Sequence, residues 1–401
     1  MQYIVTENEL IEGTPKHQKP TQRLYVTEGS VHLYSSMPSV LTPADLYQAK
    51  VDAALRQVLI DCNVYVIAAR KRILIDSNSF SLSGNVMHGQ LIVQRPDGID
   101  RVPFRWSIPD ELTTEFGDVE DVAVALSGTH VNVSTARRST LFAAHAIVMQ
   151  AESGLTDQDR DLEVLYVGQG IGRSKQRSAI DRLLDHSTLQ RILAESVTFS
   201  PESEILLLLY RFEHRKTIMS TGGDFNAEPV SNSDEERAHL ARMGNVALSR
   251  HAQVALAEAA LIRYFQPVYN TMLKESDFAA RKKIRILERL LTQDMTGLIV
   301  EICSGNIRSR LRSASAAPLD LTQLLDPEAL NGSRLECDDD RLDWADQLHT
   351  MAHSHFANFP LTTPDERDTF MHGMAWSGLH RQGATVSWET EVSGSHTCTS
   401  S

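Results

Sequence analysis

The sequence predicts an α+β fold of several units in series, and three observations support this. The chain has 401 residues, enough for two or three domains of ordinary size. Short apolar segments with strand spacing dominate the first third, and segments with helical spacing become frequent further along. The composition, 42% hydrophobic and 23% charged residues, is that of a globular protein. It excludes a chain that is disordered throughout, a collagen and a disulfide scaffold.

Charge and cysteine content narrow the class further. The formal net charge of −13 argues against a protein that coats nucleic acid through bulk electrostatics, although it permits a local basic cleft. Four cysteines without a CxxC pair suit a reducing cytoplasm and argue against a zinc ribbon. The chain has no apolar run of membrane-spanning length, and its N-terminus (MQYIVTENEL) lacks a secretory pattern. We therefore expect a cytoplasmic protein with no membrane partner.

Residues 1–135 are expected to form a β-rich domain of unknown role. One helix is predicted near Leu46, because Thr42 suits an N-cap and Pro43 the first helical position. The turn Pro96-Asp97-Gly98 separates two of the later strand candidates. The strand candidates after the helix are Val64 to Ala68, Ile73 to Ile75, Gly89 to Gln94 and Val102 to Ile108.

Residues 136–275 have a different pattern and are expected to form a small domain of strands and helices. The acidic, turn-rich segment at about 219–247 is expected to be a mobile insertion in it. Pro267 should end the last helix. The predicted elements are a strand over Phe142 to Met149, a strand from Glu163 to Gly168, a helix from about Ser174 to Glu195, a buried strand from Glu204 to Phe212 and a helix from about Ser249 to Phe265.

The C-terminal part is expected to be a mixed α/β region over 276–376, followed by a disordered tail over 377–401. Its strand candidates are Leu298 to Cys303 and Ile307 to Leu311. Two basic clusters stand out in the chain, and each is either a solvated helix face or a nucleic-acid contact. They are Arg173, Lys175, Arg177, Arg182 and Arg191, and then Arg281, Lys282, Lys283, Arg285 and Arg289.

Glu258 is the most informative residue for function. On the helix that closes the central domain, it shares a face with the apolar Val254, Leu261, Ile262 and Phe265. A carboxylate in an apolar stripe is expensive to bury without a partner or a metal. The pattern therefore indicates a functional carboxylate, with a buried ion pair or a backbone cap as the alternative.

Three short motifs, taken in order, resemble the GIY-YIG nuclease superfamily. They are Leu165-Tyr166-Val167-Gly168-Gln169, then Arg182-Leu-Leu-Asp-His186, then Glu258-Ala-Ala-Leu-Ile followed by Pro267-Val-Tyr-Asn270. Their order, their strand or helix context and their spacings agree together. The resemblance covers about a third of the chain, the central domain only.

The resemblance implies a three-stranded antiparallel sheet flanked by helices, and a magnesium-dependent endonuclease. Glu258 would bind the metal, Mg²⁺ or another divalent ion, and Arg182 would clamp the scissile phosphate. Tyr166 would help activate the attacking water, and His186 would assist proton transfer or position a phosphate. Substrate contacts would come from Gly168, Lys175, Arg177 and Asn270. The implied partner is nucleic acid, DNA rather than RNA.

The first tripeptide of that family, GIY, is absent before the second strand. The strand expected in its place runs from Phe142 to Met149, where His145 aligns best with the missing tyrosine. Histidine can act as a general base near neutral pH, or His145 can be a structural residue of its strand. The missing tyrosine leaves an alternative function open, a catalytically inactive domain of this fold that binds nucleic acid or protein. A third alternative is an unrelated α+β protein.

A histidine cluster and a glycine-rich string each suggest another kind of binding site. His349, His353 and His355 offer a metal site on a helix, but no carboxylate or cysteine has a diagnostic spacing from them. The string Gly168-Gln-Gly-Ile-Gly172 superficially suggests a dinucleotide loop, yet it lacks the third glycine of that pattern and a parallel βαβ unit. It is better explained as a glycine-rich turn.

Overall fold

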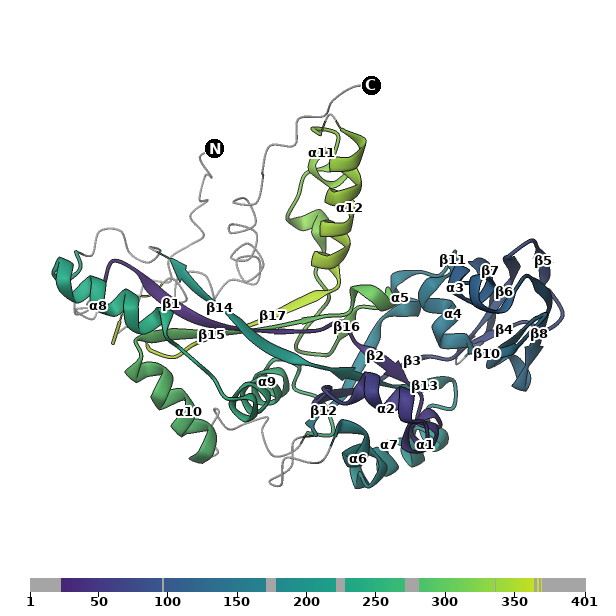
Figure 1. Ribbon diagram of the computed structural model, residues 1–401, viewed down its shortest axis with the longest axis horizontal. Helices are drawn as coiled ribbons and strands as arrows, with labels where there is room; N and C mark the ends of the chain where they lie inside the picture. Colours follow the sequence, from purple (N-terminus) through teal and green to yellow (C-terminus); the bar gives the residue numbers. More distant parts are fainter. Residues whose placement is uncertain are drawn as a thin grey trace.

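The computed structural model describes residues 23–95, 97–170, 178–220, 228–270, 281–335, 337–363, 366, 367 and 369. The expected α+β class is confirmed, since the described chain combines helices with several sheets (Figure 1). Two of these sheets share one hydrophobic core, and a β-rich lobe extends from them. None of the described helices is long and apolar enough to cross a membrane.

The central sheet has the strand order β16-β12-β3-β13-β2. Strand β3 lies in its middle and pairs antiparallel with β12 on one side and with β13 on the other. The continuous apolar run of β13 is buried on both faces, as its sequence predicts. The strands are β2 (Ser39–Leu41), β3 (Val64–Lys71), β12 (Leu162–Gln169), β13 (Ser203–Tyr210) and β16 (Leu311–Arg312).

A second sheet, in the order β14-β1-β15-β17, joins segments from opposite ends of the chain. Helix α9 (Arg250–Phe265) packs between the two sheets, and its apolar side chains form one core with strands of both. Ser249 caps α9 through the Ala252 amide, and Gln266 ends it in the left-handed region. The strands are β1 (Glu28–Ser35), β14 (Phe212–Ser220), β15 (Met295–Cys303) and β17 (Ser354–Pro360).

Four short helices cover the other face of the central sheet and bury a second core there. Asp52 divides the first two, because its side chain accepts hydrogen bonds from the Ala54 and Leu55 amides and caps a new helix. Ser178 and Asp181 form a capping box that starts the third. The helices are α1 (Asp45–Val51), α2 (Ala53–Leu59), α6 (Ala179–Leu184) and α7 (Ser187–Phe199).

Residues 73–155 form a separate lobe with its own hydrophobic core, which we call the inserted lobe (Figure 1). It leaves the central sheet after β3 and returns just before β12. It holds a three-stranded and a five-stranded sheet with helices α3 (Asp110–Phe116) and α4 (Ala144–Gln150). Its strands are β4 (Ile73–Ile75), β5 (Ser81–Ser83), β6 (Val86–Arg95), β7 (Gly98–Ser107), β8 (Val119–Ala125), β9 (His130–Thr135), β10 (Ser139–Ala143) and β11 (Glu152–Ser153).

The remaining helices lie at the margins of the second sheet or in connections. Helix α8 begins with a capping box at Asn232 and Glu235 and buries His239 and Met243. Helix α10 packs Leu290 against the core that surrounds α9. The elements are α5 (Asp157–Arg160), α8 (Ser233–Gly244), α10 (Arg281–Thr292), α11 (Pro327–Leu330) and α12 (Asp338–Ala352), with short 3₁₀ turns at Leu126–Gly128, Gly305–Ile307 and Leu321–Gln323.

The expected division at 1–135, 136–275 and 276–376 does not describe the packing. Strands β2 and β3 belong to the central sheet, and β1 pairs with β14 and with the C-terminal β15. The boundary near residue 135 falls inside the inserted lobe. Hydrophobic periodicity identifies strands but not their partners, and these partners lie far apart in the sequence.

Several local predictions also differ from the structure. The segment from Phe142 to Met149 is mostly helix α4 rather than a strand, and the helix expected from Ser174 to Glu195 is broken at His186. Within the supposed mobile insertion, β14 extends to Ser220 and α8 is an ordered helix, while 221–227 lie outside the described residues. Only the end of the strand expected at Ile307 to Leu311 is extended. The predicted tail over 377–401 also lies outside the described residues.

Buried histidines predict a loss of stability in acid. Burial lowers the pKa of His145 and that of His355 to about 4, from the ordinary 6.5. Because the folded pKa is depressed, each neutral ring stabilises the fold above about pH 6.5, and this contribution is lost as pH falls toward 4. Each histidine accounts for roughly 2 kcal/mol at pH 5.

We expect the free energy of unfolding, measured by urea denaturation, to fall steeply between pH 7 and pH 5. In His355→Gln, stability at pH 7 should drop, since the ring contacts Leu311 O and the Tyr264 hydroxyl, but the decline with pH should be shallower. An exposed histidine, His88, provides the control variant His88→Gln with an unchanged slope. Equal slopes for His355→Gln and the wild type would contradict this assignment.

Candidate functional site

Two tyrosines from neighbouring strands of the central sheet stand at the centre of the candidate site. Tyr65 on β3 and Tyr166 on β12 have ring centroids 6.2 Å apart and planes 24° from parallel. Tyr65 is opposite Gly168 in the ladder. A Cβ atom at position 168 would lie 2.6 Å from Cζ of Tyr65, so glycine leaves the space that this ring fills. Gly168 therefore positions a tyrosine, and its predicted substrate contact stays a prediction.

A β-bulge puts both tyrosines on one face of the sheet. The β12–β3 register shifts between Val164 and Tyr166. Val164 packs in the core around α9, so strict alternation would send Tyr166 to that same face. With the extra residue, Tyr166 instead joins Tyr65 in the core under the short helices.

His186 packs edge-on against both tyrosine rings, with centroids 4.9 Å from Tyr166 and 5.8 Å from Tyr65. It is the N-cap of α7, and its Nδ1 accepts a hydrogen bond from the Leu189 amide at 3.1 Å. Burial, aided by the nearby charge of Arg182, lowers its pKa, so the ring is neutral at pH 7. With Nδ1 accepting, the proton of the neutral ring is on Nε2. His186 is thus a hydrogen-bond donor toward the site.

Arg182 and Glu258 supply opposite charges beside the tyrosine pair. The Arg182 side chain, at the exposed end of α6, is near enough to the Tyr65 hydroxyl to act on its pKa. Glu258, half-buried on α9, is near enough to both hydroxyls for its charge to act on them. The neighbours of Glu258 on the helix face, Val254 and Leu261, are fully buried, as the apolar stripe predicts.

Both tyrosines are protonated at neutral pH. Burial is the main reason that the pKa of Tyr65 lies far above its ordinary value, and the neighbouring Tyr166 raises it further. Burial and then the charge of Glu258 raise the pKa of Tyr166, while Arg182 opposes the shift. Each protonated phenol therefore carries an O–H that can donate a hydrogen bond.

Asn270 fastens the end of the domain to β12. Its Oδ1 accepts from the Val167 amide at 2.9 Å, and its Nδ2 donates to the Val167 carbonyl at 2.8 Å. The side chain is buried. It therefore completes the edge of β12 beyond β16, in the way a neighbouring strand would. The predicted substrate contact of Asn270 stays a prediction.

The structure brings together Tyr166, Arg182, His186 and Glu258, the four residues on which the sequence hypothesis depends. His145 is not among them. It lies on α4 of the inserted lobe, where Arg70, Asp45 and His130 are its charged neighbours. The predicted base at this position was wrong, because the segment is not the first strand of the sheet. Lys175 and Arg177 lie outside the described residues.

Tyr65 is the residue that sequence reasoning missed. The signal was present, since Val64-Tyr65-Val66 opens a segment that is correctly predicted as a strand. The first tyrosine lies far from the second strand in the sequence, because the inserted lobe separates β3 from β12. His145 was therefore aligned in place of a tyrosine that lies much earlier in the chain.

A metal at this site would have one protein carboxylate, that of Glu258. The described residues contain no group of three or more His, Cys, Asp or Glu side chains arranged for a metal. Mg²⁺ fits such a site, because it keeps several waters and takes one or two carboxylates together with substrate phosphates. A zinc site would need more protein ligands.

The histidine-rich segment near the C-terminus is occupied by backbone contacts. His349 Nε2 lies 2.8 Å from Gly305 O, His353 Nδ1 lies 2.7 Å from His349 O, and His355 Nε2 lies 2.7 Å from Leu311 O. These rings hold α12 and β17 to their neighbours. The three histidines thus do not form a shared metal site among the described residues.

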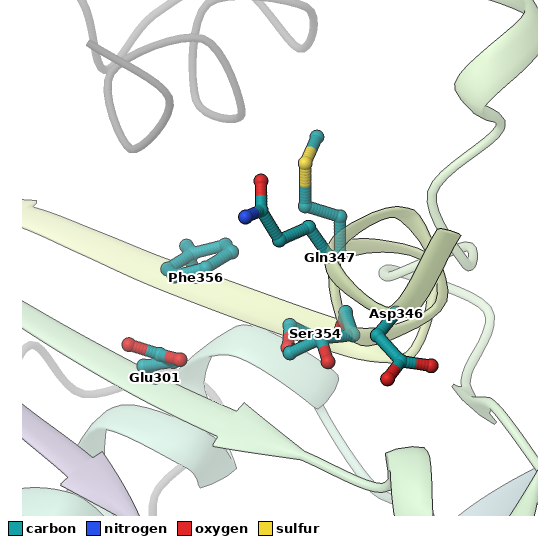
Figure 2. A pocket seen from close by; sticks show the side chains of 7 residues that line it. Glu301, Asp346, Gln347, Ser354 and Phe356 are labelled. Carbon is teal, nitrogen blue, oxygen red and sulfur yellow. Dashed lines mark hydrogen bonds between the residues drawn. The ribbon is translucent and has the colours of Figure 1, made fainter. Parts of the chain in front are cut away.

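A hollow lies between α12 and strands β15 and β17, away from the tyrosine pair (Figure 2). Its volume is about 220 Å³. Glu301 and Asp346 stand at opposite ends of it and do not converge (Figure 2). Glu301 is 2.9 Å from His32. The hollow lacks the converging charges of the tyrosine site.

Comparisons of the chain with protein-family models, with curated proteins and with solved structures found no match. The case for a function therefore depends on the geometry of the site.

The close approach at Gly168 predicts the effect of adding one methyl group. In Gly168→Ala the new Cβ would push against the Tyr65 ring, and overpacking of this kind costs about 1–3 kcal/mol. Urea denaturation should show that loss. The control is Gly244→Ala at the end of α8, where a Cβ meets nothing within 4 Å, and stability should hold or rise slightly. A Gly168→Ala protein as stable as wild type would mean that Tyr65 does not rest on this strand.

Proposed function

We propose that the chain is a metal-dependent nuclease of the GIY-YIG kind, which hydrolyses phosphodiester bonds in nucleic acid, with DNA as the favoured substrate. One observation carries the proposal. Two tyrosines on adjacent antiparallel strands, an arginine, a neutral histidine and a carboxylate from three separate helices converge on one site. With Tyr65 in place, the objection that the first tyrosine is missing no longer applies.

Arg182 is suited to hold the scissile phosphate. The Arg182 side chain is exposed beside Tyr65, and the planar fork of an arginine matches two phosphate oxygens. The nearby Glu258 gives the site an opposite charge, so a bound phosphate would lie between a cationic and an anionic group.

The tyrosines and His186 are suited to orient water and phosphate rather than to remove a proton in their resting state. Both phenols are protonated and His186 carries its proton on Nε2, so all three offer donors at neutral pH. Fixed donors aimed at a phosphate stabilise the charge that develops on it. The role proposed for His186 is therefore to position the phosphate.

Glu258 would hold the divalent cation, which when bound supplies positive charge to the phosphate and its leaving oxygen. The negative charge of the whole chain, −13, makes local cations necessary for any contact with a polyanion. Arg182 provides one at the site. Arg285 and Arg289 on α10, elsewhere on the surface, are exposed and have no ion pair among the described residues, so they are further candidate cations for such a contact.

Glu258→Gln tests the proposal directly. Purified protein is incubated with supercoiled plasmid and with single-stranded DNA or RNA, with Mg²⁺ or with a chelator. We expect the wild type to cleave only with the metal, and the variant to lose roughly 100-fold or more in rate, because the amide keeps the shape but not the charge. Glu288→Gln, at an exposed position on α10, is the matched control and should cleave normally.

Cleavage by Glu258→Gln at the wild-type rate would remove this carboxylate from the mechanism. If the wild-type protein binds nucleic acid but cuts none of the substrates under any condition, the inactive binding module is the correct function. Unchanged melting temperatures would show that both variants fold.

Removing single hydroxyls tests the tyrosine pair. We expect Tyr166→Phe and Tyr65→Phe each to lower the cleavage rate by about 10- to 100-fold, since each removes an O–H donor that lies close to the charges of Arg182 and Glu258. Substrate affinity, measured without metal, should change little in Tyr166→Phe. Tyr47→Phe, at an exposed tyrosine on α1, is the control. Normal cleavage by both site variants would show that the pair only packs.

A further inference from the structure

A cavity of about 270 Å³ lies at the junction between the inserted lobe and the central sheet. Arg72 and Glu204 line it from the sheet side, and His130 and His145 from the lobe. The volume far exceeds the ~30 Å³ of one water, so the cavity can admit a molecule of several heavy atoms. It is separate from the tyrosine site, and none of the proposed nuclease residues lines it.

His145 lines this cavity from the inserted lobe. The side chain is 8% exposed, yet its ring nitrogens are not among the fully buried polar atoms that lack a partner. The ring can therefore offer a hydrogen bond to a ligand or a water in the cavity. The residue that the sequence hypothesis placed in the nuclease site thus has a different environment.

A buried group behind the wall is incompletely satisfied. Arg70 is 4% exposed, and its Nε donates to Glu204 Oε1 at 2.6 Å. Its Nη1 and Nη2 have no hydrogen-bond partner in the described part of the chain. Arg70 therefore balances the charge of Glu204, although two of its nitrogens remain without a hydrogen bond.

Arg72 and His145 supply the donors of the cavity wall. Burial, then the charge of Arg70, lower the pKa of His145, His130 acts in the same direction, and Asp45 on α1 opposes them. At pH 7 the ring is therefore neutral and can donate one hydrogen bond. Arg72 spends one terminal nitrogen on Ser203 O. Since Glu204 is paired with Arg70, Arg72 is the charge in the wall that an anion would meet.

Apolar side chains form part of the wall. Ile73, Leu74 and Ala143 contribute hydrocarbon surface beside the charged groups, the histidines and the hydroxyls of Thr42, Ser127 and Thr129. A fully hydrated inorganic ion would leave this surface uncovered, whereas a short hydrocarbon chain would bury it.

We propose that this cavity binds a small organic acid, with its carboxylate between Arg72 and His145 and a short apolar chain against Ile73, Leu74 and Ala143. Since the walls come from the sheet and from the lobe, the bound acid holds the two together. The proposal is independent of the nuclease function, because the two sites share no residue.

Butyrate is the probe for this site, used with the full-length protein in isothermal titration calorimetry at pH 7. Butyramide has nearly the same shape without the charge, butylamine reverses the charge, and inorganic phosphate is an oxyanion without the apolar chain. We expect butyrate to bind and to raise the melting temperature, and the other three to bind at least tenfold more weakly. Phosphate that binds better than butyrate, or butyramide that binds equally well, would overturn the proposal.

Two variants locate the binding. Arg72→Gln should weaken butyrate roughly tenfold or more, the loss typical of one charge-assisted hydrogen bond. Arg105→Gln removes an exposed arginine elsewhere on the lobe and should not change the affinity. Ala143→Leu should fill the cavity and block butyrate without removing a polar group, which covers the case in which Arg72→Gln folds poorly. Unchanged affinity in Ala143→Leu, or no butyrate binding by the wild type, would refute the proposed site.

Discussion

Strand β3 hydrogen-bonds to β12 along one edge and to β13 along the other, and these two ladders align every functional group in the central sheet. Its first residues present Tyr65 to Tyr166 and Gly168. Its last residues carry Arg70 opposite Glu204, and Glu204 lines the cavity between the central sheet and the inserted lobe. A shift of β3 by one residue would turn Tyr65 to the opposite face and remove it from Arg182 and His186.

The sequence predicts individual elements of this arrangement well. The strand at Val64, the apolar strand at Glu204 and the helix that carries Glu258 occur where their periodicity indicates, because each follows from local burial. The order Tyr166, Arg182, His186 and Glu258 also identifies residues that meet in space. Such local patterns are sufficient when neighbours in the motif are neighbours in the fold.

The features that sequence reasoning missed all depend on contacts between distant segments. Pairing of β3 with β12 across the inserted lobe hid Tyr65, and pairing of β1 with β15 joined regions that look like separate domains. The bulge near Tyr166 has no signature in the residues themselves, since it is the partner strand that defines the extra residue. The helix break at His186 depends on a side chain that caps the next helix rather than continuing the first.

The point of attachment of the inserted lobe has a consequence for how such a chain can be shortened or extended. Ala69 pairs with Glu163, so the lobe leaves and re-enters the sheet at adjacent positions, as a hairpin turn would. The entropy of closing a loop grows only slowly with its length, so the ladder tolerates a turn of a few residues or a whole folded lobe at this place. The two strands thus act as a modular junction, at which material can be exchanged without altering the register of the tyrosines.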